Sequence, residues 1–336
     1  MRRDAALSTA DSSGSASGTP QLSLRAAPTG TRWFVSEFKL YRKHAALCVM
    51  LLPVIAYFII FRYIPMGGLM IAFKNYKLGL GILKSPWNGT ANFKQAFSTV
   101  TFRRAFGNTL YISLYKLGFG FPMPIILAVF LNEIRHMRFK RTVQTISYLP
   151  HFLSWIIVAG IFRNILSPNT GMVNYVLVNW FGLAKPIYFL GTNNTFRSTL
   201  VVTEIWKGVG WGSILYLATI SSIDPALYES AMCDGATRFQ RILYITLPHL
   251  APTITILLIL NIGGILDAGF DQIFNMYNSA VYATGDIIDT YVYRYGLGEM
   301  KYAFGTAVGL FKNAIGFMLV IGTNTLAKRI SEFGLW

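Results

Sequence analysis

The segment 227–253 reads LYESAMCDGATRFQRILYITLPHLAPT and separates two long apolar blocks. Pro225, just ahead of it, can begin a helix because its missing N–H would be unpaired in a first turn anyway. Gly235 supplies a turn that a side chain would hinder. The stretch from Arg238 to Leu247 suits a second, amphipathic helix, and we expect Pro248 to end it. The segment therefore predicts two short helices at a fixed angle, forming a knob that can seat in a cleft on a partner.

Apolar blocks flank this segment and recur along the chain. Of the 336 residues, 53% are hydrophobic and only 13% are charged, whereas roughly 25% of a typical soluble domain is charged. A helix of about 20 apolar residues crosses roughly 30 Å of hydrocarbon. The composition thus excludes a soluble globular protein and predicts an all-α polytopic membrane protein with six transmembrane helices. We expect the spans at about 45–65, 108–131, 143–162, 198–220, 250–270 and 303–327.

The net charge of +16 could indicate nucleic-acid binding, but the basic residues lie mostly between apolar blocks. This placement favours membrane topology over a solvated basic face. Four basic residues fall within 132–142, and Lys328 and Arg329 follow the last span. Because Lys and Arg accumulate in cytoplasmic loops, both termini and the loop 221–249 are predicted to be cytoplasmic. The opposite segment 66–106 holds six basic residues, but long loops translocate despite their charge.

The ends of the chain differ from the apolar blocks in composition. Residues 1–30 are rich in Ser, Ala, Thr, Gly and Pro and predict a disordered cytoplasmic tail. They lack the apolar core of a signal peptide, although their Arg and Ser content is similar to that of an organellar transit peptide. Segment 31–44 mixes aromatic and basic residues, as an interfacial amphipathic helix does. Residues 328–336 are expected to form a cytoplasmic C-terminal tail.

The loop between the fourth and fifth spans resembles the signature loop of permease subunits in ATP-driven, binding-protein-dependent importers. That pattern is Glu-Ala-Ala, three residues, Gly, nine residues, then Ile-x-Leu-Pro, and Ser230 stands here where the family usually has Ala. The stretches LPHFLSWIIVAGIF, IWKGVGWGSILYLA, LILNIGGILDAGFDQIF, GDIIDTYVYRYGL and EFGLW are similar to the polysaccharide-uptake branch of the maltose-type sugar permeases. The similarity extends from about residue 40 to Trp336, and an alginate (oligouronate) importer is one candidate within this branch.

The resemblance implies a maltose-type importer permease fold whose loop 221–249 carries a cytoplasmic coupling helix. The implied partners are a second homologous permease, two copies of a cytoplasmic ATPase and an external solute-binding protein at a bacterial inner membrane. No Gly-Lys dipeptide occurs in the sequence, so the chain lacks the phosphate-cradling loop of such ATPases. ATP and Mg are therefore expected on the partner ATPase, with no cofactor or metal in this chain. The expected ATPase-docking residues are Glu229, Ser230, Ala231, Asp234, Gly235, Ile245, Leu247 and Pro248.

Ionisable residues inside spans are costly and need an explanation. Glu204 and Lys207 lie three apart on one helical face and could simply neutralise each other. Lys116 and Lys312 could snorkel or meet carboxylates across the bundle. Within the spans, four cations stand against two anions, and an excess of positive charge in a cavity would favour an acidic sugar. The residues counted are Arg62, Lys116, Lys207 and Lys312 against Glu204 and Asp267.

The resemblance also implies that sugar contacts the fourth and fifth spans. Sugar rings stack on aromatic side chains, and their hydroxyls need polar partners. Simple helix packing is the competing explanation for each aromatic residue. The predicted substrate-binding residues are Lys207, Gly208, Trp211, Asn261, Asp267, Phe270 and Asp271.

Two other classes of function compete with an importer permease. A membrane enzyme acting on lipid-linked sugar would need a catalytic carboxylate cluster or a metal site. Its nearest candidates, Asp286 and Asp289, have no His or Cys nearby in the sequence, and Cys48 and Cys233 lack metal spacing. A stand-alone transporter would leave the docking loop without a purpose. The sequence therefore predicts a non-enzymatic permease subunit forming, with a second permease, the path for an oligo- or polysaccharide.

Overall fold

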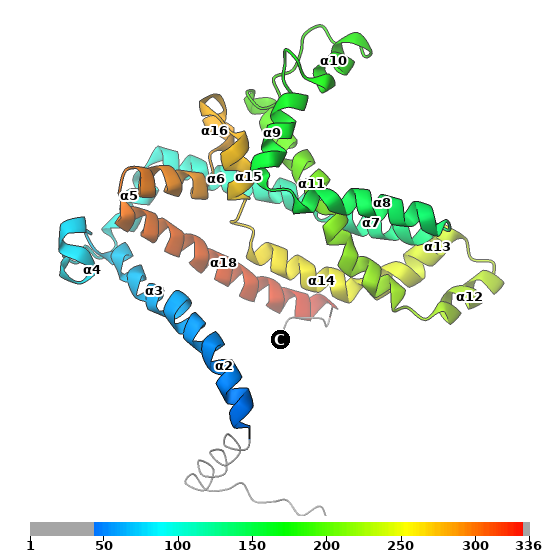
Figure 1. The fold of residues 1–336 in the computed structure, drawn as a ribbon, viewed down its shortest axis with the longest axis horizontal. Helices are drawn as coiled ribbons and strands as arrows, with labels where there is room; N and C mark the ends of the chain where they lie inside the picture. Colours follow the sequence, from blue (N-terminus) through cyan, green and yellow to red (C-terminus); the bar gives the residue numbers. More distant parts are fainter. Residues whose placement is uncertain (1–43, 332–336) are drawn as a thin grey trace, which may run out of the picture. The chain divides into compact units, whose positions relative to one another are not determined.

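The computed structural model describes residues 44–331, and regular structure in this range is helical (Figure 1). Within the same range, β-pairing is limited to one antiparallel bridge between Lys74 and Trp87. The predicted all-α fold is confirmed. The predictions for residues 1–43 and 332–336 lie outside the described residues. The chain divides into two compact units, Met1–Pro65 and Met66–Trp336.

The described part of the first unit is one apolar helical run with a π-helical turn, and the second unit contains the remaining helices. In chain order, the elements are α2 (Ala45–Phe58), η1 (Ile59–Tyr63), α3 (Ile64–Met66), η2 (Gly67–Phe73), η3 (Leu78–Leu80), α4 (Gly81–Lys84), α5 (Ala91–Ser98), α6 (Val100–Tyr115), η4 (Lys116–Gly120), α7 (Pro122–Glu133), α8 (Met137–Tyr148), η5 (Leu149–Phe152), α9 (Trp155–Ile165), α10 (Met172–Asn179), α11 (Asn193–Ser221), α12 (Pro225–Cys233), α13 (Arg238–Arg241), η6 (Ile242–Thr246), α14 (Leu247–Gly263), α15 (Phe270–Met276), η7 (Ser279–Val281), α16 (Tyr282–Gly285), α17 (Ile288–Val292), η8 (Tyr293–Gly298) and α18 (Tyr302–Ser331).

Not every predicted span forms a straight apolar helix. By length and composition, four helical runs among the described residues can cross a membrane, and a pair bent by 107° would make a fifth. Helix α11 contains the predicted span 198–220 but is less apolar, because Glu204, Lys207 and several Thr and Ser residues interrupt it. The total of six spans stays a prediction. The four runs are Ala45–Phe73, Val100–Glu133, Arg238–Gly263 and Tyr302–Arg329, and the bent pair is Met137–Phe152 with Trp155–Ile165.

Helix α11 is the centre of the second unit and contacts α7, α8, α14 and α16. Figure 1 shows α7 and α8 running alongside part of it. Its close approach to the end of α8 depends on Gly210, where an added Cβ would lie 2.1 Å from the Ser147 carbonyl oxygen. Small residues at such crossings let helix backbones approach within a membrane. The side chains of Leu200, Tyr216 and Ile220 are buried and contribute apolar packing around α11.

The predicted fifth span, 250–270, is broken in the structure. Helix α14 ends at Gly263, and α15 begins only at Phe270, after Gly269 in the left-handed region at φ 89°. An added Cβ at Gly263 would lie 2.4 Å from a methyl of Val320 in α18. The glycines therefore permit both a close helix crossing and an irregular backbone, which within a membrane is tolerated where protein or a cavity surrounds it.

The expectation that Pro248 ends a helix is wrong. Pro248 lies in the first turn of α14, and one helical run continues from Arg238 to Gly263. The π-helical turn η6 directly precedes α14. Its wider hydrogen-bond spacing accommodates a residue that lacks an N–H and whose ring would clash in a regular α-helix.

Candidate functional site

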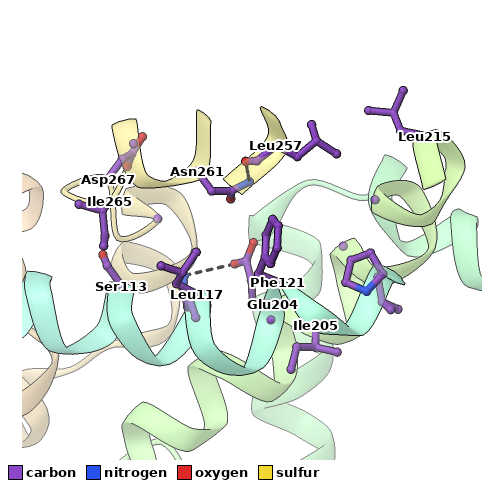
Figure 2. A pocket seen from close by; sticks show the side chains of 18 of the residues that line it. Ser113, Leu117, Phe121, Glu204, Ile205, Leu215, Leu257, Asn261, Ile265 and Asp267 are labelled. Atoms are coloured by element: carbon purple, nitrogen blue, oxygen red, sulfur yellow. Dashed lines mark hydrogen bonds and ion pairs between the residues drawn. The ribbon is translucent and has the colours of Figure 1, made fainter. Parts of the chain in front are cut away.

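A cavity of about 410 Å³ lies between α6–η4–α7, α11 and the end of α14. Figure 2 shows Ser113, Leu117 and Phe121 coming from one side, with Asn261 and Asp267 facing them from the other. The wall is mostly apolar with a few polar groups, as is usual for sites that bind small molecules. Its polar side chains are Ser113, Lys116, Glu204, Tyr216, Asn261 and Asp267.

Lys116 connects the three elements around this cavity. Its Nζ donates to the Glu204 carboxylate at 3.2 Å, to the Ala268 carbonyl at 2.8 Å and to the Gln272 side-chain oxygen at 2.5 Å. An added Cβ at Gly269 would lie 2.8 Å from the same Nζ, so the ammonium group occupies space that only glycine leaves open. Lys116 thereby ties the broken backbone after α14 to α11.

A second set of hydrogen bonds continues from Lys116 into the core. The buried Gln272 amide donates to the Leu200 carbonyl at 2.7 Å and to Thr203 Oγ1 at 2.8 Å. Because all three groups are satisfied, α15 is fixed against α11 by polar contacts as well as by apolar packing.

Glu204 and Lys207 do not form the pair that their spacing suggested. Glu204 binds Lys116, whereas Lys207 Nζ donates to the His151 carbonyl at 2.7 Å and lies 5.5 Å from the Trp155 ring centroid. The His151 ring in turn stacks on Trp211 with centroids 4.5 Å apart. Lys207 and Trp211 therefore contact the bend between α8 and α9, and neither side chain lines the cavity.

The expected excess of positive charge is wrong for this cavity. Lys312 is neutralised by Asp289, whose carboxylate oxygens lie 2.8 and 2.7 Å from its Nζ. The ionisable side chains that line the cavity are one cation, Lys116, and two carboxylates, Glu204 and Asp267. The Glu204 side chain is 41% exposed. This wall of the cavity thus carries one net negative charge.

The structure separates the predicted substrate residues into three groups. Gly208, Asn261 and Asp267 line the cavity, while Lys207 and Trp211 face the bend described above. Phe270 packs against Phe274 and Tyr293, and Asp271 is exposed on α15. Sequence reasoning did not place Ser113, Lys116, Glu204 or Tyr216 at the site. The sequence could have indicated two of these four residues, because Lys116 and Glu204 are charged residues inside predicted spans.

The loop 221–249 contains the predicted first short helix as α12, but its second helix is not a short separate one, because α13 begins a helical run that continues to Gly263. Asp224 caps α12 by accepting from the Ala226 N–H at 2.9 Å, and Pro225 occupies the first turn. Gly235 makes the turn at φ 78°, and Thr237 with Gln240 forms a capping box at the start of α13. Such caps satisfy N–H groups that a helix leaves unpaired, so the knob is locally self-supporting.

The docking residues present a mixed surface. Glu229, Ser230, Asp234, Gly235 and Pro248 are exposed, while Ala231, Ile245 and Leu247 are half-buried. One hydrogen bond of 2.9 Å, between the Tyr228 and Thr246 hydroxyls, joins α12 to η6. The exposed residues are thus accessible to a partner, and the half-buried ones attach the knob to the helices.

Residues 120–331 match the family of inner membrane components of binding-protein-dependent transport systems. The chain belongs to this family. As a permease of this kind, it acts with a solute-binding protein, and the sequence-based prediction of an importer permease is confirmed. Membership also favours the importer over the two alternatives, a membrane enzyme and a stand-alone transporter.

Similar proteins cover most of this permease. Protein LplB of Bacillus subtilis is 44% identical over 86% of this chain and 91% of its own length. The polygalacturonan/rhamnogalacturonan transport system permease YteP of the same organism is 42% identical over 86% and 90%. A chain from a crystal structure of a bacterial ABC transporter for the acidic polysaccharide alginate is 45% identical, with a TM-score of 0.82 over 88% of this chain and 99% of that one. The predicted permease fold is confirmed.

Proposed function

We propose that this chain forms, with a second homologous permease, the path by which an oligosaccharide enters the cytoplasm. The cavity between α11 and the broken fifth span is the observation that carries the proposal. The side-chain amide of Asn261 and the carboxylates of Glu204 and Asp267 line this cavity. Gly208 also lines it and has no side chain to fill the space. Carboxylate and amide oxygens accept hydrogen bonds from sugar hydroxyls, while the apolar wall suits the faces of sugar rings.

An acidic oligosaccharide is the favoured substrate class. One relative is named for polygalacturonan and rhamnogalacturonan transport, and the similar crystal structure belongs to an importer of alginate. Since this chain's cavity wall is net negative, the substrate carboxylates would meet cations elsewhere on the path. Hydroxyl groups, and not carboxylates, are then the groups that Glu204 and Asp267 bind.

The energy for transport would come from a partner. Permeases of this family work with a second permease and a cytoplasmic ATPase, and ATP with Mg would bind there. We infer that both termini and the loop 221–249 face the cytoplasm, so that Glu229 and Gly235 reach the ATPase. The exposed surface of α12 and its rigid caps support this role.

A glycine substitution tests the cavity. An added Cβ at Gly208 meets nothing within 4 Å, so a Gly208→Leu side chain would extend into open space instead of clashing with the fold. We expect transport of the oligosaccharide to fall at least about tenfold, equivalent to about 1.4 kcal/mol, with assembly of the complex unchanged. Transport by the reconstituted importer measures the effect.

Gly160→Leu is the matched control, because Gly160 in α9 also has open space around it but does not line the cavity. We expect this variant to transport at the normal rate. If the assembled Gly208→Leu complex also transported normally, this cavity could not be the path.

A further inference from the structure

A second cleft, of about 490 Å³, lies beside α15 and is not used by the cavity described above. Three aromatic rings, one cation and a short apolar stretch form its wall. The lining residues are Phe274, Tyr277, Tyr293, Arg294, Leu297 and Gly298.

Phe274 of α15 and Tyr277, the residue that follows this helix, line the cleft, and Phe270 stacks on Phe274. Phe270, Phe274 and Tyr277 recur at i, i+4 and i+7, which places them along one helical face. Gln272 and Met276, on the opposite face, are buried in the core. Phe270 directly follows Gly269, which lines the central cavity. The aromatic face therefore extends from the edge of the cavity into the second cleft.

The rings form a contiguous surface that remains open. Phe274 stacks on Phe270 with centroids 5.2 Å apart, and Tyr293 meets Phe274 edge-on at 4.9 Å. Phe274 is 37% exposed and Tyr293 is 45% exposed. Exposed aromatic faces of this kind match the apolar C–H faces of sugar rings.

Arg294 is held in a fixed orientation at the same cleft. Its guanidinium binds the Asp286 carboxylate at 2.6 and 3.3 Å and lies 4.6 Å from the Tyr282 ring centroid. Burial opposes its charged form, but the hydrogen bond and charge of Asp286 outweigh that effect and raise the pKa of Arg294. A guanidinium carries five N–H donors, so donors remain beyond the two that Asp286 uses. Its side chain is 30% exposed.

We propose that this cleft is a second oligosaccharide subsite, which takes a uronate unit next to the central cavity. The sugar ring stacks on Phe274 and Tyr293, and its carboxylate accepts from the remaining N–H groups of Arg294. Arginine is suited to this role because its planar fork matches a carboxylate. The proposal rests on the proposed function in that the central cavity is the path, and it supplies the cation which that cavity lacks.

Direct binding to the complete importer, without its solute-binding protein, tests the subsite. The probes are labelled hexagalacturonate and labelled maltohexaose, which differ in their carboxylates. For the double variant Phe274→Ala, Tyr293→Ala, we expect affinity for both probes to fall about tenfold. Each of the two lost ring contacts accounts for part of this loss. Phe317→Ala removes a more exposed ring, 68% exposed, from α18 and should leave both affinities unchanged.

Arg294→Lys separates charge from geometry. Lysine keeps the positive charge beside buried Asp286 but loses the planar fork. We expect hexagalacturonate affinity to fall several-fold and maltohexaose affinity to stay the same. Equal losses for the two probes would overturn the assignment of Arg294 to the carboxylate.

Other outcomes would also overturn the subsite. These are unchanged affinities in the double variant, failure of the wild-type complex to bind either probe, and loss of the second permease from the double variant during size-exclusion chromatography. The last result would make the cleft a subunit interface. If the cleft variants bound both probes with normal affinity while Gly208→Leu lost transport, only the subsite proposal would be overturned. Lost affinity in the cleft variants together with normal transport in Gly208→Leu would overturn the central cavity as the path, and with it the place of the subsite beside that path, but not sugar binding in the cleft.

Discussion

Lys116 illustrates how one residue sets the geometry of the site. It has three partners on two other elements: Glu204, the Ala268 carbonyl and Gln272. The Lys116 side chain is almost buried, and the π-helical turn that it begins is a feature often found at functional sites. The irregular backbone at Ala268 is thus held by a charge-assisted hydrogen bond, which is stronger than a neutral one.

Removing this cation should loosen the cavity. Lys116→Met leaves the Glu204 carboxylate and the Ala268 carbonyl without their partner. Because the Glu204 side chain is 41% exposed, water offsets part of this loss, and we expect a cost of about 1 kcal/mol. We expect a lower melting temperature for the purified complex and reduced transport of every substrate. Adding Glu204→Gln removes the stranded charge and should restore part of the stability. Lys94→Met, at an exposed position on α5, is the control, and equal stability of Lys116→Met and Lys94→Met would contradict the role given to Lys116.

At the scale of elements, the docking knob is set by local geometry. Gly235 adopts φ 78°, but an added Cβ would meet nothing within 4 Å. A larger residue there would be strained by about 1 kcal/mol without a clash inside the chain. The consequences of changing Gly235 should therefore appear at the partner and not in the membrane helices.

We expect Gly235→Leu to abolish transport and to weaken association with the ATPase, because a changed turn angle misplaces α12. Reversing the exposed charge with Glu229→Lys should act in the same direction. Co-purification of the ATPase and transport measure both effects. Gly89→Leu imposes similar strain at φ 56°, also with open space, and should leave ATPase association intact. Normal association in Gly235→Leu would show that the loop does not dock.

At the scale of the whole molecule, orientation determines which face meets which partner. The α10 region and the docking knob belong to different loops of the second unit. If the termini are cytoplasmic, the segment around Lys185 is external and Thr237 is internal. Both residues are exposed in the structure, so accessibility depends on the side of the membrane.

Cysteine labelling tests this orientation. The native Cys48 and Cys233 are first replaced by Ser, because Cys233 is itself exposed. A membrane-impermeant maleimide applied to intact cells should then label Lys185→Cys but not Thr237→Cys. Permeabilised cells should show labelling at both positions. The opposite pattern in intact cells would reverse the orientation and with it the docking argument.

Composition and short motifs were enough to predict the membrane class, the short helix α12 with its turn at Gly235, and the family. These features depend on composition and on short spacings, such as Pro225 and Gly235 in one loop, which local backbone chemistry decides. The same logic failed at Pro248, where a π-helical turn carries the helix onward. The predicted total of six spans stays a prediction, because α11 mixes polar and apolar residues.

The pairing of the charges and the lining of the cavity depend on contacts between residues far apart in the chain. Lys116 and Glu204 are 88 positions apart, and Lys116 and the Ala268 carbonyl are 152 apart. Such contacts depend on how each helix is rotated and where it breaks, which spacing along one chain does not specify. The three-residue spacing of Glu204 and Lys207 suggested a local pair, but packing turned Lys207 toward His151 and left Glu204 to Lys116. Helix rotation likewise brought Phe274, Tyr293 and Arg294 to one cleft.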